Sequence, residues 1–369
     1  MPSSGSFSSR LPLRLAAAAL LVLAAAAAPA WEVKTFGGRD HVGLDEIGAF
    51  YGLGEVQSPT ATTRALHGNG RDLAATINNR EMRINGVKHW LAFPVMEVGG
   101  KAYVSRLDLG KTIEPAFRPT RIPNFPAVTT VVLDPGHGGR DNGARSPYEN
   151  EKNFTLDVAR RVRNALQKAG LRVILTRNTD SFVELADRAA VGNRAKNAIF
   201  VSLHFNAADS NPSASGFEIF CVTPRGAPST AYEQTRERDM VAENGNDHDI
   251  HSFALANAIY HSMEGRIPMF DRGVKRARFA VLRQSQIPAV LIEGGFLTNA
   301  SDARKVATKS WRDSYAAAIV GGILEYKKLA ERHIPPREVS AYQHPESVRI
   351  PVAAAPPPGP ALGLRDLPE

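Results

Sequence analysis

The stretch VVLDPGHGGRDNGARSPYENEKNFTL, residues 131–156, is the most informative part of this chain. An apolar run ends at a carboxylate, Asp134, and a glycine-rich turn with one histidine, His137, follows it. An acidic cluster then opens a segment with helical periodicity. A strand, a turn and a helix in this order are typical of an alternating α/β fold. The turn itself is compatible with a bound phosphate, a bound metal ion or no ligand.

The first 30 residues have the pattern of a secretory signal peptide. A polar and basic start is followed by the apolar run LAAAALLVLAAAA, and APA at 28–30 offers small residues for cleavage. A retained anchor is the rival interpretation, but the run is alanine-rich and short for a membrane span. We expect an exported protein whose mature chain begins near Trp31 and has no membrane span. The periplasm is the expected location, and secretion or cell-wall association is the alternative.

Composition narrows the class of partner. The formal net charge is +8, and a basic exported protein suits an anionic cell-wall polymer better than nucleic acid. The single cysteine, Cys221, cannot form an internal disulfide. It lies in the strand-like run GFEIFCV, which predicts a buried, inert thiol.

The chain divides into segments of different character. Short strand patterns in residues 31–118 predict a small β-rich domain for wall binding or spacing. Three prolines mark 119–128 as a linker. Residues 129–332 form the expected catalytic domain, interrupted by a polar, exposed insertion at 223–249. The proline-rich tail, 333–369, is predicted to be disordered.

Strand and helix patterns alternate after residue 129. Apolar runs predict strands, and amphipathic segments between them predict helices. This alternation indicates an α/β fold with a mostly parallel sheet covered by helices. The expected strands are TVVLD, LRVILTR, AIFVSLH, GFEIFCV, RFAVLR and AVLIEGG.

Three of these strands end in, or are closely followed by, side chains that can bind a metal ion or transfer a proton. His137 follows Asp134, His204 ends IFVSLH, and Glu293 ends AVLIE. Ligands of open parallel sheets bind beyond the carboxyl ends of the strands, so these side chains are expected to meet at one edge. Glu293 is the hardest to explain structurally, because a carboxylate after a buried strand needs a partner or a function. Two histidines and a carboxylate indicate a zinc site with an open fourth position.

The third metal ligand is expected in the loop SPYENEK. Glu149 and Glu151 both qualify, and Glu151 has the better-fixed backbone because it starts a helix. Either carboxylate could instead simply complement the helix dipole. The residues alone leave this choice open.

Other chemistries fit less well. A phosphate loop needs a lysine and a hydroxyl after its glycines, and GHGGRDNG has neither. A nucleophile elbow is absent, and Ser202 falls inside a strand. The run NDHDIH, residues 246–251, resembles a metal motif, but it adjoins the polar insertion and is interpreted as solvated surface.

The motifs, taken together and in order, resemble a known family. They are VVLDPGHGGRDNGA, the following EK, LTRNTD, VSLHFNA, DRGVKRARFAVLR and PAVLIEGGFLTN. Over about residues 129–327 the chain is similar to the zinc-dependent N-acetylmuramoyl-L-alanine amidases of the amidase_3 type, which are bacterial peptidoglycan hydrolases. The resemblance implies a twisted, mainly parallel sheet with helices on both faces.

The resemblance also implies roles for particular residues. His137, Glu151 and His204 are expected to hold Zn²⁺, and Glu293 corresponds to the catalytic glutamate of the family. Zinc would act as a Lewis acid, and Glu293 would pass a proton from water to the departing amine.

Two further residues are candidates for supporting roles. Arg283 is a candidate donor to the oxyanion, although it could equally form a structural ion pair. Asp134 is expected to orient His137 or the turn around it.

The insertion at 223–249 has a counterpart in the family. Some division-associated members carry a longer inserted helix that blocks the zinc site until an activator protein removes it. Glu233, Glu237 and Glu243 could reach a metal from this insertion. We expect it to form a lip of the substrate groove, with an activator protein as a further candidate partner.

The expected function is hydrolysis of the amide bond between N-acetylmuramic acid and L-alanine in peptidoglycan, for wall remodelling or septum splitting. A non-catalytic wall-binding or regulatory protein on the same scaffold is one alternative. A zinc hydrolase of another amide is the other.

Overall fold

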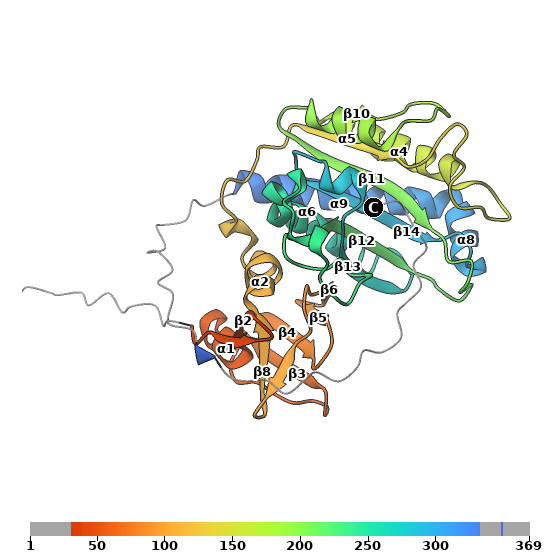
Figure 1. Cartoon of the computed structure of the whole chain (residues 1–369). Helices are drawn as coiled ribbons and strands as arrows, with labels where there is room; N and C mark the ends of the chain where they lie inside the picture. Colours follow the sequence, from red (N-terminus) through yellow and green to blue (C-terminus); the bar gives the residue numbers. More distant parts are fainter. Residues whose placement is uncertain (1–30, 333–347, 350–369) are drawn as a thin grey trace, which may run out of the picture. The chain divides into compact units, whose positions relative to one another are not determined.

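The computed structural model describes residues 31–332 and 348–349, and Figure 1 shows their arrangement. The predicted signal peptide lies outside these residues, as does the predicted disordered tail apart from β15 (Val348–Arg349). This short strand pairs in parallel with β1 (Lys34–Phe36). No helix in the described part of the chain is long and apolar enough to span a membrane.

A ten-stranded sheet forms the centre of the structure. Four of its strands are mutually parallel neighbours. Strand β12 runs antiparallel to β14, and β13 runs parallel to β12. Figure 1 shows β11, β14, β12 and β13 side by side. In spatial order the strands of this part are β10 (Arg172–Leu175), β9 (Thr130–Pro135), β11 (Ala198–Asn206), β14 (Ala289–Phe296), β12 (Phe217–Val222) and β13 (Asp271–Ala277).

Helices cover both faces of these strands. One face shares a hydrophobic core with α4, α6 and α9. The opposite face has a second core, in which Phe200 and Leu291 pack with Val281 of α7, and α5 lies over β9 and β11. The predicted fold class, a mostly parallel α/β sheet with helices on both faces and a β-rich region before it, is confirmed. The helices are α4 (Glu151–Lys168), α5 (Leu185–Asn193), α6 (Asp249–Met263), α7 (Ala280–Arg283), α8 (Ala300–Ala307) and α9 (Lys309–Glu331).

The strand register places polar side chains in one row. His204 of β11 is the register partner of Glu293 of β14, and Glu293 is in turn the partner of Glu218 of β12. Successive side chains of a strand alternate between the two faces. Because Leu291 belongs to the core beneath α7, Glu293, two residues further on, points to that same face. The row therefore lies at the carboxyl ends of β11 and β14, where the sequence predicts a site.

The N-terminal region contributes to both sheets. Four of its strands extend the large sheet, because β6 pairs in parallel with β13 at His89 and Val274. Trp90 strengthens this junction by donating from Nε1 to the carbonyl of Arg272 at 3.0 Å. The four strands are β3 (Thr63–Gly68), β4 (Arg71–Thr76), β5 (Glu81–Ile84) and β6 (Val87–Trp90).

The remaining N-terminal strands form a separate small sheet with β1 and β15. Helix α1 packs against it, and short helical turns lead towards the large sheet. Ile122 and Val128, in the predicted linker, are buried in the main core. These elements are β2 (Arg39–Gly43), α1 (Leu44–Tyr51), β7 (Met96–Val98), β8 (Lys101–Ser105), α2 (Arg106–Asp108), η1 (Leu109–Ile113), α3 (Glu114–Phe117) and η2 (Pro119–Arg121).

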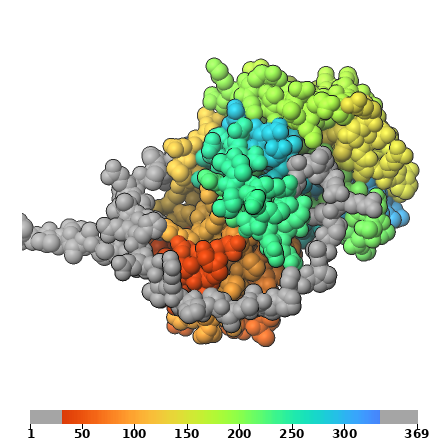
Figure 2. Space-filling view, in the orientation of Figure 1, coloured from red at the N-terminus to blue at the C-terminus, as the bar shows by residue number. Residues whose placement is uncertain are grey.

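The insertion at 223–249 is less exposed than the sequence predicts. Part of it lies on the surface seen in Figure 2 (green to turquoise), but Asp239 is fully buried and pairs with Arg278 at 2.8 Å. Arg80, from the N-terminal region, donates to the carbonyls of Pro228 and Tyr232. Buried ion pairs and contacts with backbone carbonyls compensate for the polarity of the insertion. It contains two short helices, η3 (Glu237–Met240) and η4 (Asn244–His248).

One predicted strand is wrong. RFAVLR, residues 278–283, contains the helix α7, and the strand of this region ends earlier, at Ala277. A short apolar run fits one helical turn as well as a strand, so periodicity alone could not decide. Arg278 follows the end of the strand, and its guanidinium pairs with buried Asp239.

The buried His89 predicts a specific loss of stability in acid. Burial lowers the pKa of His89 to about 4, whereas the unfolded chain binds the proton near pH 6.5. Folding stability should therefore fall by about 3 kcal/mol as the pH drops from 6.5 to 4. Denaturant unfolding across this pH range should show that His89→Gln loses less folding stability in acid than the wild type, by this amount. The same change at exposed His261 should leave the pH profile of the wild type, and an unaltered profile for His89→Gln would contradict the assignment.

Candidate metal centre

The glycine-rich turn after β9 brings His137 close to His204. His137 itself has a left-handed backbone, with φ of 60°. A Cβ atom at Gly136 would lie 2.3 Å from Cε1 of His204, and one at Gly143 would lie 2.5 Å from Oε2 of Glu151. Only glycine leaves room for these rings and this carboxylate. The turn is therefore shaped around the three side chains.

Two buried arginines fix the backbone of this turn. Arg177 donates to the carbonyls of Pro135 and Gly136, at 2.9 and 2.8 Å. Arg188, on α5, donates to the carbonyl of His137 at 2.8 Å and pairs with Asp134 at 2.8 Å. Asp134 therefore supports the turn through Arg188, which is one of the two roles that the sequence predicts for it. No contact from Asp134 to the ring of His137 is seen.

Glu151 is held in one orientation by four contacts. It is the first residue of α4 and is almost completely buried. Oε1 accepts from the backbone N–H of Phe205 at 2.9 Å and lies 3.0 Å from Nδ1 of His204. Oε2 accepts from the N–H of Ala144 at 2.8 Å and lies 3.0 Å from Nε2 of His137. Each carboxylate oxygen thus faces one histidine.

His137, Glu151 and His204 form a group that could hold a metal ion. One ligand atom from each lies within 4.8 Å of the others. Nε2 of His137 is buried and has no hydrogen-bond partner, although a carboxylate oxygen lies nearby. Two imidazoles and a carboxylate are a suitable donor set for a metal with an open position. The residues therefore fit a metal, and this is the only such group in residues 31–332 and 348–349.

The charges within this group are complementary. Burial alone would raise the pKa of Glu151, but the close ring nitrogens and the charges of His137 and His204 outweigh it and hold the pKa well below its usual range. Burial opposes protonation of His137, yet Glu151 and Asp141 raise its pKa to about 8. The carboxylate is consequently ionised and available as a ligand.

Asp141 is a functional residue that the sequence analysis did not single out. Its Oδ2 lies 2.8 Å from Nδ1 of His137. A carboxylate on the far nitrogen fixes the ring and its tautomer, which leaves Nε2 free for a metal. The only sequence signal is an aspartate four residues after the histidine, inside a glycine-rich turn whose path could not be foreseen.

Comparison with known proteins identifies the family. The family model described as N-acetylmuramoyl-L-alanine amidase, Amidase_3, matches residues 131–325, more than half of the chain. The chain belongs to this amidase family. The family prediction from the sequence motifs is confirmed.

Individual relatives cover the same half of the chain. It is 34% identical over 218 residues to the amidase AmiC of Escherichia coli O6:H1, covering 53% of this chain and 52% of AmiC. It is 31% identical to AmiA of Escherichia coli K12, covering 53% of this chain and 75% of AmiA. The chain thus spans about half the length of the first relative and three quarters of the second.

Solved structures include the catalytic domain of the amidase CwlV from Bacillus (Paenibacillus) polymyxa var. colistinus. It is 30% identical, with a TM-score of 0.46, and the match covers 55% of this chain and 99% of that domain.

Glu293 of this amidase family member lies beside the metal group in an unusual environment. The residue is buried, and its Oε2 has no hydrogen-bond partner among the described residues. Burial, together with the charges of Glu151 and Glu218, raises the pKa of Glu293 well above its usual value. A buried carboxyl oxygen without a partner is costly for stability, so such a group indicates a role in function.

A buried charged cluster flanks Glu293 on the side of β12 and β13. Glu218 is fully buried, and its Oε2 accepts from Lys275 at 2.5 Å and from Arg272 at 2.7 Å. Its Oε1 accepts from Asn206 at 2.8 Å, which ties the cluster to the strand of His204. Two basic side chains thus share one carboxylate in this cluster.

Arg283, the predicted oxyanion donor, lies elsewhere. It ends α7, and its Nη1 is 3.7 Å from Oε2 of Glu243. It is not among the residues that line the cavity beside the metal group. The ion pair matches the alternative that the sequence analysis gave for this residue.

The other candidate ligands fall outside the metal group. Glu149 is exposed in the loop, and its carboxylate accepts hydrogen bonds only from neighbouring residues. The run NDHDIH was expected to be solvated surface, and this is wrong for two of its residues, because Asp249 and His251 are buried. Asp249 pairs with Lys111, and His251 contacts the carbonyl of Pro123. None of the insertion carboxylates belongs to the metal group, namely Glu233, Glu237 and Glu243.

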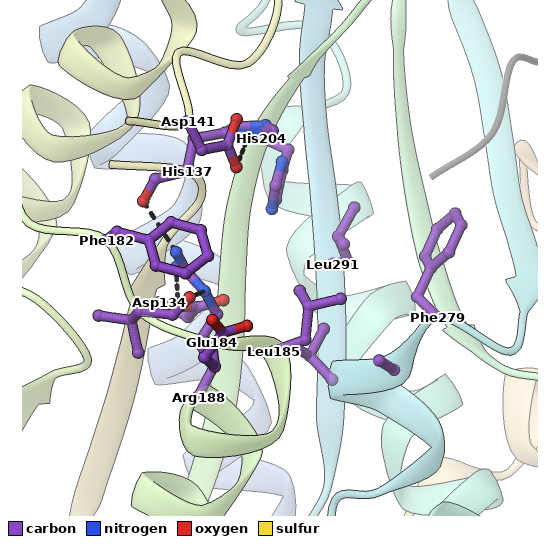
Figure 3. A pocket seen from close by; sticks show the side chains of 13 residues that line it. Asp134, His137, Asp141, Phe182, Glu184, Leu185, Arg188, His204, Phe279 and Leu291 are labelled. Carbon is purple, nitrogen blue, oxygen red and sulfur yellow. Dashed lines mark hydrogen bonds and ion pairs between the residues drawn. The ribbon is translucent and has the colours of Figure 1, made fainter. Parts of the chain in front are cut away.

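A cavity of about 240 Å³ opens beside the metal group. Figure 3 shows His137, Asp141 and His204 gathered at one end of it, with Leu185, Leu291 and Phe279 further along. The cavity lies over the face of the sheet between α5 and α7. A substrate placed in it would be in contact with the metal group.

The close approach at Gly136 provides a test of this geometry. In Gly136→Ala the new methyl group must displace the His204 ring, so metal affinity should fall by roughly 10- to 100-fold. Zinc titration against a competing chelator measures this change. The matched control is Gly110→Ala, whose new Cβ meets no atom within 4 Å. Equal zinc affinity in both variants would contradict the described site.

Proposed function

We propose that this chain is a zinc-dependent amidase that hydrolyses the bond between the lactyl group of N-acetylmuramic acid and L-alanine in peptidoglycan. The observation that carries the proposal is the meeting of His137, Glu151 and His204 in one group beside Glu293, which is buried and whose Oε2 has no hydrogen-bond partner among the described residues. Membership of the N-acetylmuramoyl-L-alanine amidase family supports the substrate.

The residues divide the reaction between binding and proton transfer. His137, Glu151 and His204 would hold the zinc ion, which supplies a Lewis acid for the amide carbonyl and lowers the pKa of water. Asp141 keeps the His137 ring in the required orientation. Glu293 takes a proton from the attacking water and returns it to the nitrogen of L-alanine as the C–N bond breaks.

This mechanism assigns a role to Asp134 and none to Arg283. A role for Arg283 at the oxyanion has no supporting contact, because the residue pairs with Glu243. Asp134 acts as a positioning residue through Arg188, which donates to the carbonyl of His137.

The setting of this activity is also a proposal. An exported enzyme, acting in the periplasm or at the cell wall, agrees with its family and with the predicted signal peptide. An activator protein acting on segment 223–249 stays a prediction. The alternatives are a non-catalytic wall-binding protein and a hydrolase of another amide, and the products distinguish all three.

The test is digestion of purified sacculi, with the released peptides identified by mass spectrometry. The wild type should release stem peptides that begin with a free L-alanine amine. Glu293→Gln, with zinc bound, should lose activity by about 10²- to 10⁴-fold, because proton transfer is removed.

Glu149→Gln serves as the matched control, since this carboxylate is exposed and outside the metal group. It should digest sacculi at the wild-type rate. Wild-type activity in zinc-loaded Glu293→Gln would refute the mechanism, and release of a different product would favour the alternative amide.

A further inference from the structure

The loop that follows β10, residues 178–184, lies directly against the glycine-rich turn of the metal group. A Cβ atom at Gly138 would lie 2.2 Å from the carbonyl oxygen of Ser181. One at Gly139 would lie 2.7 Å from the backbone nitrogen of Phe182. The loop is otherwise mostly exposed, and its Phe182 lines the cavity beside the metal group. The turn and the loop are therefore in backbone contact.

Gly139 is a central residue of a tight turn within this segment. The backbone groups of Gly138 and Asp141 bond to each other, from N–H to carbonyl, at 2.9 and 3.1 Å. This pairing does not include the N–H and the carbonyl of Gly139, which need partners elsewhere. Gly139 also lies midway between His137 and Asp141, whose carboxylate orients the His137 ring. The orientation of Gly139 therefore affects both of these side chains.

Asp180 and Lys152 supply both partners of Gly139. Oδ1 of Asp180 accepts from the N–H of Gly139 at 2.7 Å, and Nζ of Lys152 donates to the carbonyl of Gly139 at 2.8 Å. The same Nζ lies 2.8 Å from Oδ2 of Asp180, which closes a ring of three contacts. This ring, here named the Gly139 clip, joins the glycine-rich turn, the start of α4 and the loop 178–184.

The contacts of the Gly139 clip are stronger than those of an ordinary surface ion pair. The side chain of Lys152 is only 12% exposed, although that of Asp180 is 48% exposed. An exposed ion pair alone contributes little to stability. Here each charged group also bonds to the backbone, and charge-assisted hydrogen bonds are roughly twice as strong as neutral ones. Bonds to the backbone also fix the path of the chain.

The Gly139 clip lies next to the metal group in the sequence as well. Glu151 and Lys152 are the first two residues of α4 and share one rigid backbone. A shift of Gly139 relative to Lys152 therefore moves His137 relative to Glu151. Nε2 of His137 and Oε2 of Glu151 are 3.0 Å apart, and metal binding tolerates only about 0.2 Å of error in each ligand distance.

We propose that Asp180 and Lys152 are positioning residues of the metal centre, and that the Gly139 clip couples zinc binding to the order of the loop 178–184. This inference rests on the proposed function, because it takes zinc as the metal. Coupling is reciprocal: zinc binding orders the loop, and a loop held by the clip raises zinc affinity. The motifs EK and LTRNTD, which contain Lys152 and Asp180, thereby have one shared role.

The first measurement is zinc affinity, by titration against a competing chelator. Asp180→Ala and Lys152→Met each break the clip and should lower zinc affinity by roughly 10-fold, as loss of a supporting contact around a metal site does. The double variant should lose about the same factor as either single variant, because the clip is already broken in each. Asp187→Ala and Lys168→Met make the same changes at exposed positions and should keep wild-type affinity.

The second measurement is the backbone order of residues 178–184, from nitrogen-15 relaxation with and without zinc. Zinc should raise the order parameters of this loop in the wild type and change them little in Asp180→Ala. A residue that only stabilises the fold would alter the free energy of unfolding and leave this response to zinc intact.

A second variant of Asp180 covers the case in which Asp180→Ala folds poorly. Asp180→Asn keeps an acceptor for the N–H of Gly139 but loses the charge that faces Lys152, and it should lose zinc affinity in the same direction. Wild-type zinc affinity in folded Asp180→Ala or Asp180→Asn overturns the proposal. A wild-type loop whose order does not respond to zinc overturns it as well.

Failure of the Gly139 clip is distinct from failure of the proposed function. A wild type that binds zinc and digests sacculi, with clip variants of equal zinc affinity, overturns the clip alone. A wild type that binds zinc but releases no stem peptide overturns the proposed function, and the clip is then judged by zinc affinity and loop order. A wild type that binds no zinc overturns both.

Discussion

The arrangement of the site depends on one buried carboxylate, that of Glu151. Its two oxygens are each fixed by a backbone N–H, from Phe205 and from Ala144, and each faces a histidine. A carboxylate with this degree of burial is unfavourable unless it is hydrogen-bonded and paired. The first residue of α4 therefore joins the glycine-rich turn to β11, and the two histidines cannot move independently of it.

The sheet determines what surrounds this carboxylate. The register of β11, β14 and β12 places His204, Glu293 and Glu218 in a row on one face. Two residues before Glu293 along β14, the same face carries the apolar side chain of Leu291, which lines the cavity beneath α5 and α7. Side chains alternate between the two faces along each strand. The polar side chains at the strand ends and the apolar wall of the cavity therefore lie on the same face.

Much of the site could be predicted from the sequence, because apolar runs that end in Asp134, His204 and Glu293 mark strand ends. Glu149 and Glu151 could not be separated, since both lie near a helix start and only burial distinguishes them. The role of Asp141 could not be predicted, because it depends on the path of the turn. The pairing of β6 with β13 joins segments far apart in the chain, and no local pattern predicts it. The exposure of segment 223–249 was overestimated because its buried partners, Arg80 and Arg278, lie outside it.

We propose that Glu151, with the two histidines, binds one zinc ion. The most direct measurement is the metal content of the purified full chain, by mass spectrometry of elements, for the wild type, Glu151→Gln and Glu149→Gln. We expect one zinc ion per chain in the wild type and in Glu149→Gln, and loss of most of the zinc in Glu151→Gln. A wild type without zinc after loading, or full zinc in Glu151→Gln, would contradict it.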